Sequence, residues 1–253
     1  MLRSDGRRAN QLRPIEIQRG YTELAHGSVL MIMGKTRVLC TASFESGVPE
    51  WRESKNSGWL TAEYDMLPAS TGRRRARSRN RVDGRSQEIQ RLIGRALRAV
   101  VDMDKLAPYT VWIDCDVVQA DGGTRTAAIT GAFVALHDAV ARALNSKLIA
   151  EQPILDSIAA VSVGRVNGKL LLDLDYQEDA AAEVDLNAAM TGSGRFVEIQ
   201  GTGESATFTR SELDRMLRLV ARGCRQLHRC QQQALDRSRS QAARSAKRSP
   251  TRR

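Results

Sequence analysis

The sequence predicts a mixed α+β protein in which several strands followed by a helix occur twice. Three observations support this: short runs with strand-like alternation, amphipathic helical segments after them, and a similar order in the second half. The 253 residues, 42% of them hydrophobic, can bury a sizeable core. No stretch reaches the ~18 uninterrupted apolar residues of a membrane helix. The N-terminus lacks the apolar segment of a secretory signal, so membrane and secreted classes are set aside.

Strand signals open the first half of the chain. Gly34-Lys35 separates two apolar runs, and this turn signal predicts a hairpin. An arginine-rich stretch follows the last of these strands and is predicted to be an exposed loop. The predicted strands cover residues 15–17, 28–33, 36–43 and 59–67.

Two helices and one strand complete the first half. Apolar residues at helical spacing predict a helix over residues 86–101. Residues 110–118 alternate in polarity and predict a strand. The pair Gly122-Gly123 interrupts this pattern, and a second helix is predicted over residues 124–145.

The second half repeats the plan of strands followed by a helix. Asn167-Gly168 is a favoured hairpin turn, and the Thr209–Glu212 spacing is a capping box that predicts a helix start. The predicted strands cover residues 158–166, 169–175, 183–190 and 195–200. After Asp236 the composition reduces largely to Arg, Ser, Ala, Lys and Gln, which predicts disorder. The expected organisation is one domain over residues 1–236 and a basic tail over residues 237–253.

The net charge of +10 is concentrated in two segments. Residues 73–81 contain six arginines and no acid, and residues 237–253 contain seven Lys or Arg and no acid. The remainder has 26 basic and 29 acidic residues, so a nearly neutral globule carries two basic segments. Such concentrated positive charge favours a polyanionic partner, most commonly RNA or DNA. A solubilising tail is the alternative for residues 237–253.

The cysteines and histidines do not suggest a zinc site. None of the four cysteines forms a CxxC pair, and the three histidines are scattered. We expect core thiols in a reducing cytosol. Neither a Ser/His/Asp nor a Cys/His arrangement can be argued from three such histidines. The cysteines are Cys40, Cys115, Cys224 and Cys230.

The segment Asp121-Gly122-Gly123-Thr124-Arg125 lies where a predicted strand gives way to a helix. Paired glycines let backbone N–H groups approach a ligand closely, and a helix start adds unpaired donors with a partial positive charge. The Thr124 hydroxyl and the planar Arg125 fork match phosphate oxygens. The segment is a candidate anion site, and a plain turn with Thr124 as N-cap is the alternative.

Arg85 is predicted at the N-cap, or just before it, of the helix that follows the arginine run. A cation is poorly placed there, because the helix dipole favours cations at the C-terminal end. A residue that breaks a local rule is a candidate for function. An exposed arginine without a role is the alternative.

An acidic stretch runs from Asp173 to Asp185, with at least five carboxylates within thirteen residues. They repel one another unless cations are near, and oxygen ligands without His or Cys suit Mg²⁺ or Mn²⁺. Asp179, in a connection, and Asp185, on the polar face of a strand, could converge on one ion. A solvated acidic hairpin is the alternative.

An anion site, a hard-metal site and a polyanion-binding loop together favour phosphoryl chemistry on nucleic acid. No P-loop or GxGxxG follows a strand, which disfavours ordinary nucleoside triphosphate hydrolysis. Inorganic phosphate is already a nucleophile at neutral pH, so its attack needs no histidine base. Arginine forks and a metal ion would neutralise the approach of two anions.

Several longer motifs stand out in order along the chain. They are RSDGR at 3–7, VLCTA at 38–42, TAEY at 61–64, GRSQEIQRLI at 84–93, DCDV at 114–117, QADGGTRT at 119–126, and the acidic run through 185–187. Together they resemble the bacterial ribonuclease PH family over residues 1 to about 236. Ser86 stands where that family usually has Thr, a change that keeps the hydroxyl.

This resemblance implies a phosphate-dependent 3′→5′ exoribonuclease that trims tRNA precursors in the cytoplasm and releases nucleoside diphosphates reversibly. It implies the duplicated βαβ fold shared with polynucleotide phosphorylase and exosome ring subunits, and a hexameric ring built as a trimer of dimers. It assigns phosphate binding to Arg85, Gly123, Thr124 and Arg125, and the divalent metal, Mg²⁺ or Mn²⁺, to Asp179 and Asp185. The two aspartates and two arginines form the catalytic set. RNA guidance falls to Arg73, Arg74, Arg75, Arg77, Arg79 and Arg81.

Two alternatives from other classes remain. A non-catalytic ring subunit would be expected to lack part of the catalytic set, yet all four residues are present. A plain RNA-binding module would not need paired acids, which are unfavourable near RNA without a metal. A requirement for added phosphate would separate the enzyme from both.

Overall fold

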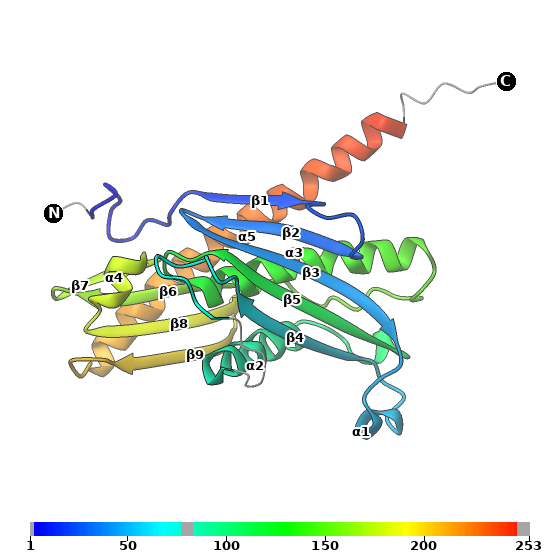
Figure 1. Cartoon of the computed structure of the whole chain (residues 1–253), viewed down its shortest axis with the longest axis horizontal. Coiled ribbons are helices and arrows are strands. Elements are labelled where there is room, and N and C mark those ends of the chain that lie inside the picture. The colour runs from blue at the N-terminus through cyan, green and yellow to red at the C-terminus, as the bar shows by residue number, and fades with distance from the viewer. Residues whose placement is uncertain (1–2, 77–82, 247–253) are drawn as a thin grey trace.

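Two β-sheets with helices packed on them build the molecule (Figure 1). The computed structural model describes residues 3–76 and 83–246, with the backbone alone for residues 237–246. Each predicted strand is present, and the α+β class is confirmed. Short alternating or apolar runs form the strands, while the longer amphipathic and apolar segments form the main helices.

The first sheet has the strand order β1-β2-β3-β5-β4. Strand β4 runs parallel to β5, and the other neighbours are antiparallel. The predicted hairpin joins β2 to β3, with Gly34 in the left-handed region at φ +60°. The strands are β1 (Ile15–Arg19), β2 (Gly27–Met33), β3 (Thr36–Ser46), β4 (Trp59–Met66) and β5 (Tyr109–Gln119).

The second sheet is antiparallel throughout, in the order β7-β6-β8-β9. Strand β8 buries Val184, Leu186 and Ala188 and leaves Asp185 and Asn187 partly exposed on its other face, as its alternation predicted. The strands are β6 (Ile158–Val166), β7 (Lys169–Leu172), β8 (Val184–Thr191) and β9 (Phe196–Gly203).

Helix α3 (Thr124–Asn145) joins the two sheets, because it packs on β2 and β3 of the first and on β6 of the second. It is long and apolar enough to cross a membrane by length and composition, but most of it lies in the core. One continuous core therefore includes residues of both sheets. The other helices are α1 (Glu50–Glu53), α2 (Gly84–Arg98), the 3₁₀ turn η1 (Asp104–Leu106), α4 (Tyr176–Ala180) and α5 (Arg210–Ala246).

The end of the predicted strand 169–175 differs from expectation. Strand β7 stops at Leu172, because Asp173 turns the chain with φ +57°, a conformation that Asp tolerates better than most side chains. Asp175 then caps helix α4, where it forms a capping box with Glu178. Asp179 consequently lies on a short helix rather than in an irregular connection.

Helix α5 also differs from expectation. It begins at the predicted capping box, in which the Glu212 N–H donates to Thr209 Oγ1 over 3.2 Å. It continues to Ala246, and its last turns extend away from the sheets (Figure 1). The prediction of disorder from residue 237 is therefore wrong for residues 237–246, where Ala, Arg and Gln are strong helix formers. Residues 247–253 lie outside the described residues.

Strand β2 packs closely against helix α3 at Gly27. A Cβ at this position would lie 1.9 Å from the Ala135 carbonyl oxygen and 2.8 Å from the Ala139 nitrogen, both helix backbone atoms. We predict that Gly27→Ala lowers the free energy of unfolding by about 2–3 kcal/mol, since strand and helix must separate. Urea unfolding measures this, and Gly72→Ala, where a Cβ meets nothing within 4 Å, is the control. Equal midpoints for Gly27→Ala and wild type would contradict this packing.

Candidate functional site

The turn before α3 is built from two glycines in the left-handed region, Gly122 at φ +74° and Gly123 at φ +63°. A Cβ on Gly122 would lie 2.6 Å from the Leu174 carbonyl oxygen, so no larger residue fits. Gly123 is the N-cap of α3, and the first N–H groups of a helix have no partner within it. Unpaired donors and the positive helix end favour an anion here.

Thr124 is the first residue of α3, so the alternative in which it is the N-cap is wrong. The Tyr64 hydroxyl, buried on β4, donates to Thr124 Oγ1 over 2.8 Å. Because Thr124 accepts this bond, its own hydroxyl hydrogen can be donated elsewhere. Burial raises the pKa of Tyr64, which therefore stays a neutral donor at physiological pH.

Arg125 is held by two neighbouring elements. Its Nη1 donates to Gln200 Oε1 of β9 over 2.9 Å and lies 3.3 Å from Glu88 Oε1 of α2. Gln200 in turn donates to the same Glu88 oxygen over 3.0 Å. This network fixes a cation beside the first turn of α3.

Arg85 is the second residue of α2, and Asp83, not Arg85, is the N-cap. The prediction that Arg85 lies at or just before the N-cap is therefore wrong. The Asp83 side chain caps the helix by accepting a hydrogen bond from the Arg85 backbone N–H. The Arg85 side chain is exposed. Burial raises the pKa values of Tyr64 and Asp179, and the charge of Arg85 opposes the rise in both. Arg85 and Arg125 therefore act on the same region.

The acidic stretch separates into paired and unpaired carboxylates. Glu178 accepts from Arg3 Nε over 2.6 Å, and Glu183 accepts from Arg165 Nε over 2.7 Å. Asp173 is paired with Arg13, at 2.7 Å. The solvated-hairpin alternative fails for Asp173 and Glu178, which are buried. Among residues 3–76 and 83–236, no ion pair is found for Asp175, Asp179 and Asp185. Asp175 caps α4, which leaves Asp179 and Asp185 as the unpaired carboxylates that are not helix caps.

The pKa values of these two carboxylates are both raised, and the charge of Asp179 acts on Asp185. Burial and the neighbouring Asp179 charge raise the pKa of Asp185 to about 6, against the opposing charge of Arg125. Asp179 keeps access to solvent, yet desolvation also raises its pKa, while Arg85, Arg125 and Arg13 oppose the shift. Asp179 and Asp185 of the second half therefore lie within electrostatic range of arginines from the first half.

The chemistry of this pair fits a hard divalent cation. Asp185 Oδ1 is buried and without a hydrogen-bond partner, whereas Oδ2 accepts from Asn187 Nδ2 over 2.8 Å. Within the described part of the chain no group of three His, Cys, Asp or Glu residues could hold a metal. A cation at Asp179 and Asp185 would keep water or substrate oxygens as its other ligands, as Mg²⁺ commonly does.

The arginine loop is described in part. Arg73 and Arg74 are exposed, and Arg75 pairs with Asp83 at 3.1 Å. That pair ties the loop to the start of α2, two residues before Arg85. The remaining candidates for RNA contact, Arg77, Arg79 and Arg81, lie outside the described residues.

Sequence reasoning missed the residues that support the site. Tyr64, Glu88 and Gln200 hold Thr124 and Arg125, and Arg13 and Asp173 form a buried ion pair. Tyr64 and Glu88 fall inside the quoted motifs, where they could have been noticed. Nothing in the local pattern of Gln200 or Arg13 indicates their partners, which are 75 and 160 residues away.

Comparison with known proteins shows the family of this chain. The chain matches the models of both domains of the RNase PH, or 3′ exoribonuclease, family: domain 1 over residues 11–141 and domain 2 over residues 156–222. The chain therefore belongs to this family. It is similar to Ribonuclease PH of Corynebacterium efficiens, with 54% identity over 235 residues, 92% of this chain and 96% of the relative. The chain is accordingly a phosphate-dependent 3′ exoribonuclease, as the motifs predicted.

Solved structures confirm the fold. Rice (Oryza sativa) Rrp46 superposes with a TM-score of 0.75 at 19% identity, covering 92% of this chain and 100% of the rice chain. A chain of the Archaeoglobus fulgidus exosome with RNA bound to the active site gives 0.78 at 23% identity, covering 90% and 92%. At these identities the likeness concerns the fold alone.

We predict that Asp185→Asn stabilises the metal-free protein at pH 7.5 by about 1–3 kcal/mol. The native pKa of about 6 lies above the ordinary 3.8, so the ionised Asp185 destabilises the native state. This penalty is full above pH 6 and vanishes below about pH 4, so the gain should shrink as pH falls. Urea unfolding between pH 4 and 8 measures it. Mg²⁺ should stabilise wild type but not the variant, and a pH-independent difference would contradict the assignment.

Proposed function

We propose that the turn before α3 and Arg85 hold the inorganic phosphate that attacks the 3′-terminal phosphodiester of RNA, chiefly of tRNA precursors. The observation that carries the proposal is the convergence of charges from both halves of the chain. Arg85 and Arg125 act electrostatically on Asp179, and Arg125 also acts on Asp185. An anion at Gly123–Arg125 would lie between helix-end donors and these arginines.

The reaction needs few protein groups. An oxygen of phosphate forms a bond to the terminal phosphorus, and the bond from that phosphorus to the preceding O3′ breaks. The products are a nucleoside diphosphate and an RNA shortened by one nucleotide, whose O3′ takes up a proton. Arg85, Arg125 and the N–H groups of α3 neutralise the charge of two approaching anions, which is the main barrier. The reverse reaction adds a nucleotide from a diphosphate.

We assign a divalent cation, Mg²⁺ or alternatively Mn²⁺, to Asp179 and Asp185. When bound, such an ion polarises phosphoryl oxygens and offsets charge on the leaving oxygen. Asp185 must be ionised to bind it, so metal affinity should rise as pH increases through about 6. The partnerless Oδ1 of Asp185 supports this assignment.

The remaining proposals concern substrate and assembly. The arginines at 73–81 would guide the RNA toward the site, because Arg75 pairs with Asp83, the N-cap of α2, two residues before Arg85. The structural relatives include exosome assemblies, which supports a ring, and we propose a hexamer built as a trimer of dimers. We place the enzyme in the cytoplasm. Residues 1–236 would form the catalytic domain and residues 237–253 a basic extension that binds RNA without specificity.

Arg125→Ala tests the phosphate site. We predict a 30- to 1000-fold loss of phosphorolysis, or about 2–4 kcal/mol, with RNA affinity largely kept. Single-turnover kinetics over a range of phosphate concentrations, beside RNA binding, measure both. Arg142→Ala, an exposed arginine in the last turn of the same helix, is the matched control. An Arg125→Ala enzyme with the wild-type dependence on phosphate would refute the assignment.

The two basic segments should contribute differently to RNA binding. We predict that Arg73→Gln/Arg74→Gln weakens binding of precursor tRNA and flattens its log–log salt dependence by about 0.7 per lost contact. Turnover of a very short RNA should change much less. Deleting residues 238–253 should lower affinity modestly and leave turnover intact. Gel shifts at several salt concentrations, with kinetics, measure these effects.

The matched control is Arg218→Gln/Arg222→Gln, which removes the same charge from exposed positions on α5. If the tail deletion alone abolished turnover while the loop variant behaved as wild type, the roles of the two segments would be reversed.

A further inference from the structure

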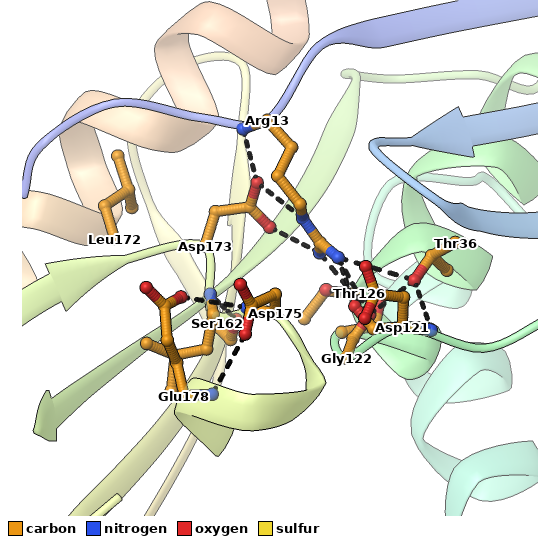
Figure 2. A network of polar contacts seen from close by, with 12 residues as sticks. Arg13, Thr36, Asp121, Gly122, Thr126, Ser162, Leu172, Asp173, Asp175 and Glu178 are labelled. Carbon is orange, nitrogen blue, oxygen red and sulfur yellow. Dashed lines mark hydrogen bonds and ion pairs between the residues drawn. The ribbon is translucent and has the colours of Figure 1, made fainter. Parts of the chain in front are cut away.

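Arg13 lies in the segment before β1 and is almost fully buried, with 3% of its surface exposed. Its Nε and Nη2 bind the two oxygens of Asp173, at 3.1 and 2.7 Å, and its backbone N–H donates to the same carboxylate over 2.7 Å. Its other end reaches the turn before α3, where Nη1 donates to the Asp121 carbonyl oxygen and lies 3.4 Å from that of Gly122. Figure 2 shows the guanidinium between Asp173 and this turn.

Asp173 begins the short segment that leads into α4, the helix that carries the candidate metal ligand Asp179. Its carboxylate is fully buried, and its carbonyl oxygen accepts from Arg3 Nη2 over 2.8 Å and Arg7 Nη1 over 2.9 Å. Two residues later Asp175 caps α4, and Arg3 binds Glu178 of the same capping box. Asp179 follows Glu178 directly, so the position of this network sets where Asp179 lies.

The phosphate turn and the start of α4 also touch directly. A Cβ on Gly122 would lie 2.6 Å from the Leu174 carbonyl oxygen, so the two backbones are in van der Waals contact. The Tyr176 N–H points to Asp121 Oδ1 at 3.5 Å. Thr36 Oγ1 accepts from the Asp121 N–H over 2.9 Å and donates to the Gly122 carbonyl oxygen over 2.8 Å, which holds the turn from the other side.

We propose that Arg13, through its ion pair with Asp173, is a positioning residue that fixes the phosphate turn of the first half against the Asp179-bearing helix of the second. The inference rests on the proposed function of those two elements. Arg13 touches neither substrate in this account. It keeps the phosphate-binding donors of the turn before α3 at a fixed distance from the Asp179 carboxylate, so that both act on the same phosphodiester.

Stability alone is a weak reason for burying such a pair. Removing two charges from water is costly, and an apolar pair of similar size often stabilises a fold as well or better. A bidentate arginine fork adds geometric precision, because one planar group binds a carboxylate and two carbonyl oxygens at fixed angles. The contacts of Arg13 are of this kind.

The test is the double variant Arg13→Gln/Asp173→Asn. Arg13→Gln alone would leave the buried Asp173 carboxylate with Arg7 Nη1, 3.5 Å from Oδ2, as its ion-pair partner and could unfold the protein. The double variant removes the charges of Arg13 and Asp173 together. The matched control is Arg19→Gln/Asp138→Asn, which removes another partly buried ion pair, between β1 and α3. Asp138 lies 13 residues beyond Arg125 on α3, or about 20 Å along the helix.

We expect the double variant to fold, with a KM for phosphate raised at least 10-fold and a kcat lowered at least 10-fold. The affinity for precursor tRNA should stay within about 2-fold of wild type. Amide hydrogen exchange should quicken together in residues 121–127 and 174–182. The control pair should change neither KM nor these exchange rates. A loss of stability alone would lower the amount of active enzyme without changing KM for phosphate.

The outcomes separate this inference from the proposed function. A folded double variant with the wild-type KM for phosphate, beside an Arg125→Ala enzyme that has lost its phosphate dependence, overturns the role of Arg13 and leaves the phosphate site intact. An Arg125→Ala enzyme that keeps its phosphate dependence overturns the site itself. If the double variant does not fold, Arg13→Lys replaces it, with the same exchange and KM readouts. Unchanged values in that variant also overturn the proposal.

Discussion

The proposed site depends on the buried ion pair between Arg13 of the first half of the chain and Asp173 of the second. Neither half contains all the residues of the proposed site. The glycine turn, Arg85 and Arg125 come from the first half, whereas Asp179 and Asp185 come from the second. Helix α3 packs on both sheets, so the two halves share one hydrophobic core. The Arg13 guanidinium then holds the turn before α3 next to Asp173 through direct hydrogen bonds (Figure 2).

Charge balance explains how such an arrangement remains folded without its substrates. Most carboxylates of the acidic stretch are neutralised by arginines or used as caps, which leaves Asp179 and Asp185 as a pair with raised pKa values. On the other side, Glu88 and Gln200 hold Arg125. The proposed site would therefore be organised in advance for a cation beside an anion, and a bound cation would relieve the repulsion between the two carboxylates.

Most of the fold could be predicted from the sequence because its signals are local. Alternation, helical spacing, the hairpin glycines and the Thr209–Glu212 box located the strands and main helices. Helix α4 was missed because the predicted strand 169–175 runs past Asp173, where the chain turns at φ +57°, and includes Asp175, which forms a capping box with Glu178. The site residues lay in motifs, and so did two of the residues that support them, Tyr64 and Glu88. Arg13 and Gln200 did not, and because their partners are 160 and 75 residues away, only tertiary structure pairs them.

The identity of the attacking group is the central claim, and the fate of labelled phosphate tests it most directly. The protein is incubated with a tRNA precursor, Mg²⁺ and ³²P-labelled inorganic phosphate, and the released nucleotides are separated. Phosphorolysis predicts nucleoside diphosphates with the label in the β-phosphate, and no release when phosphate is withheld. Unlabelled nucleoside monophosphates formed at the same rate without phosphate would show that water attacks, and would contradict the account.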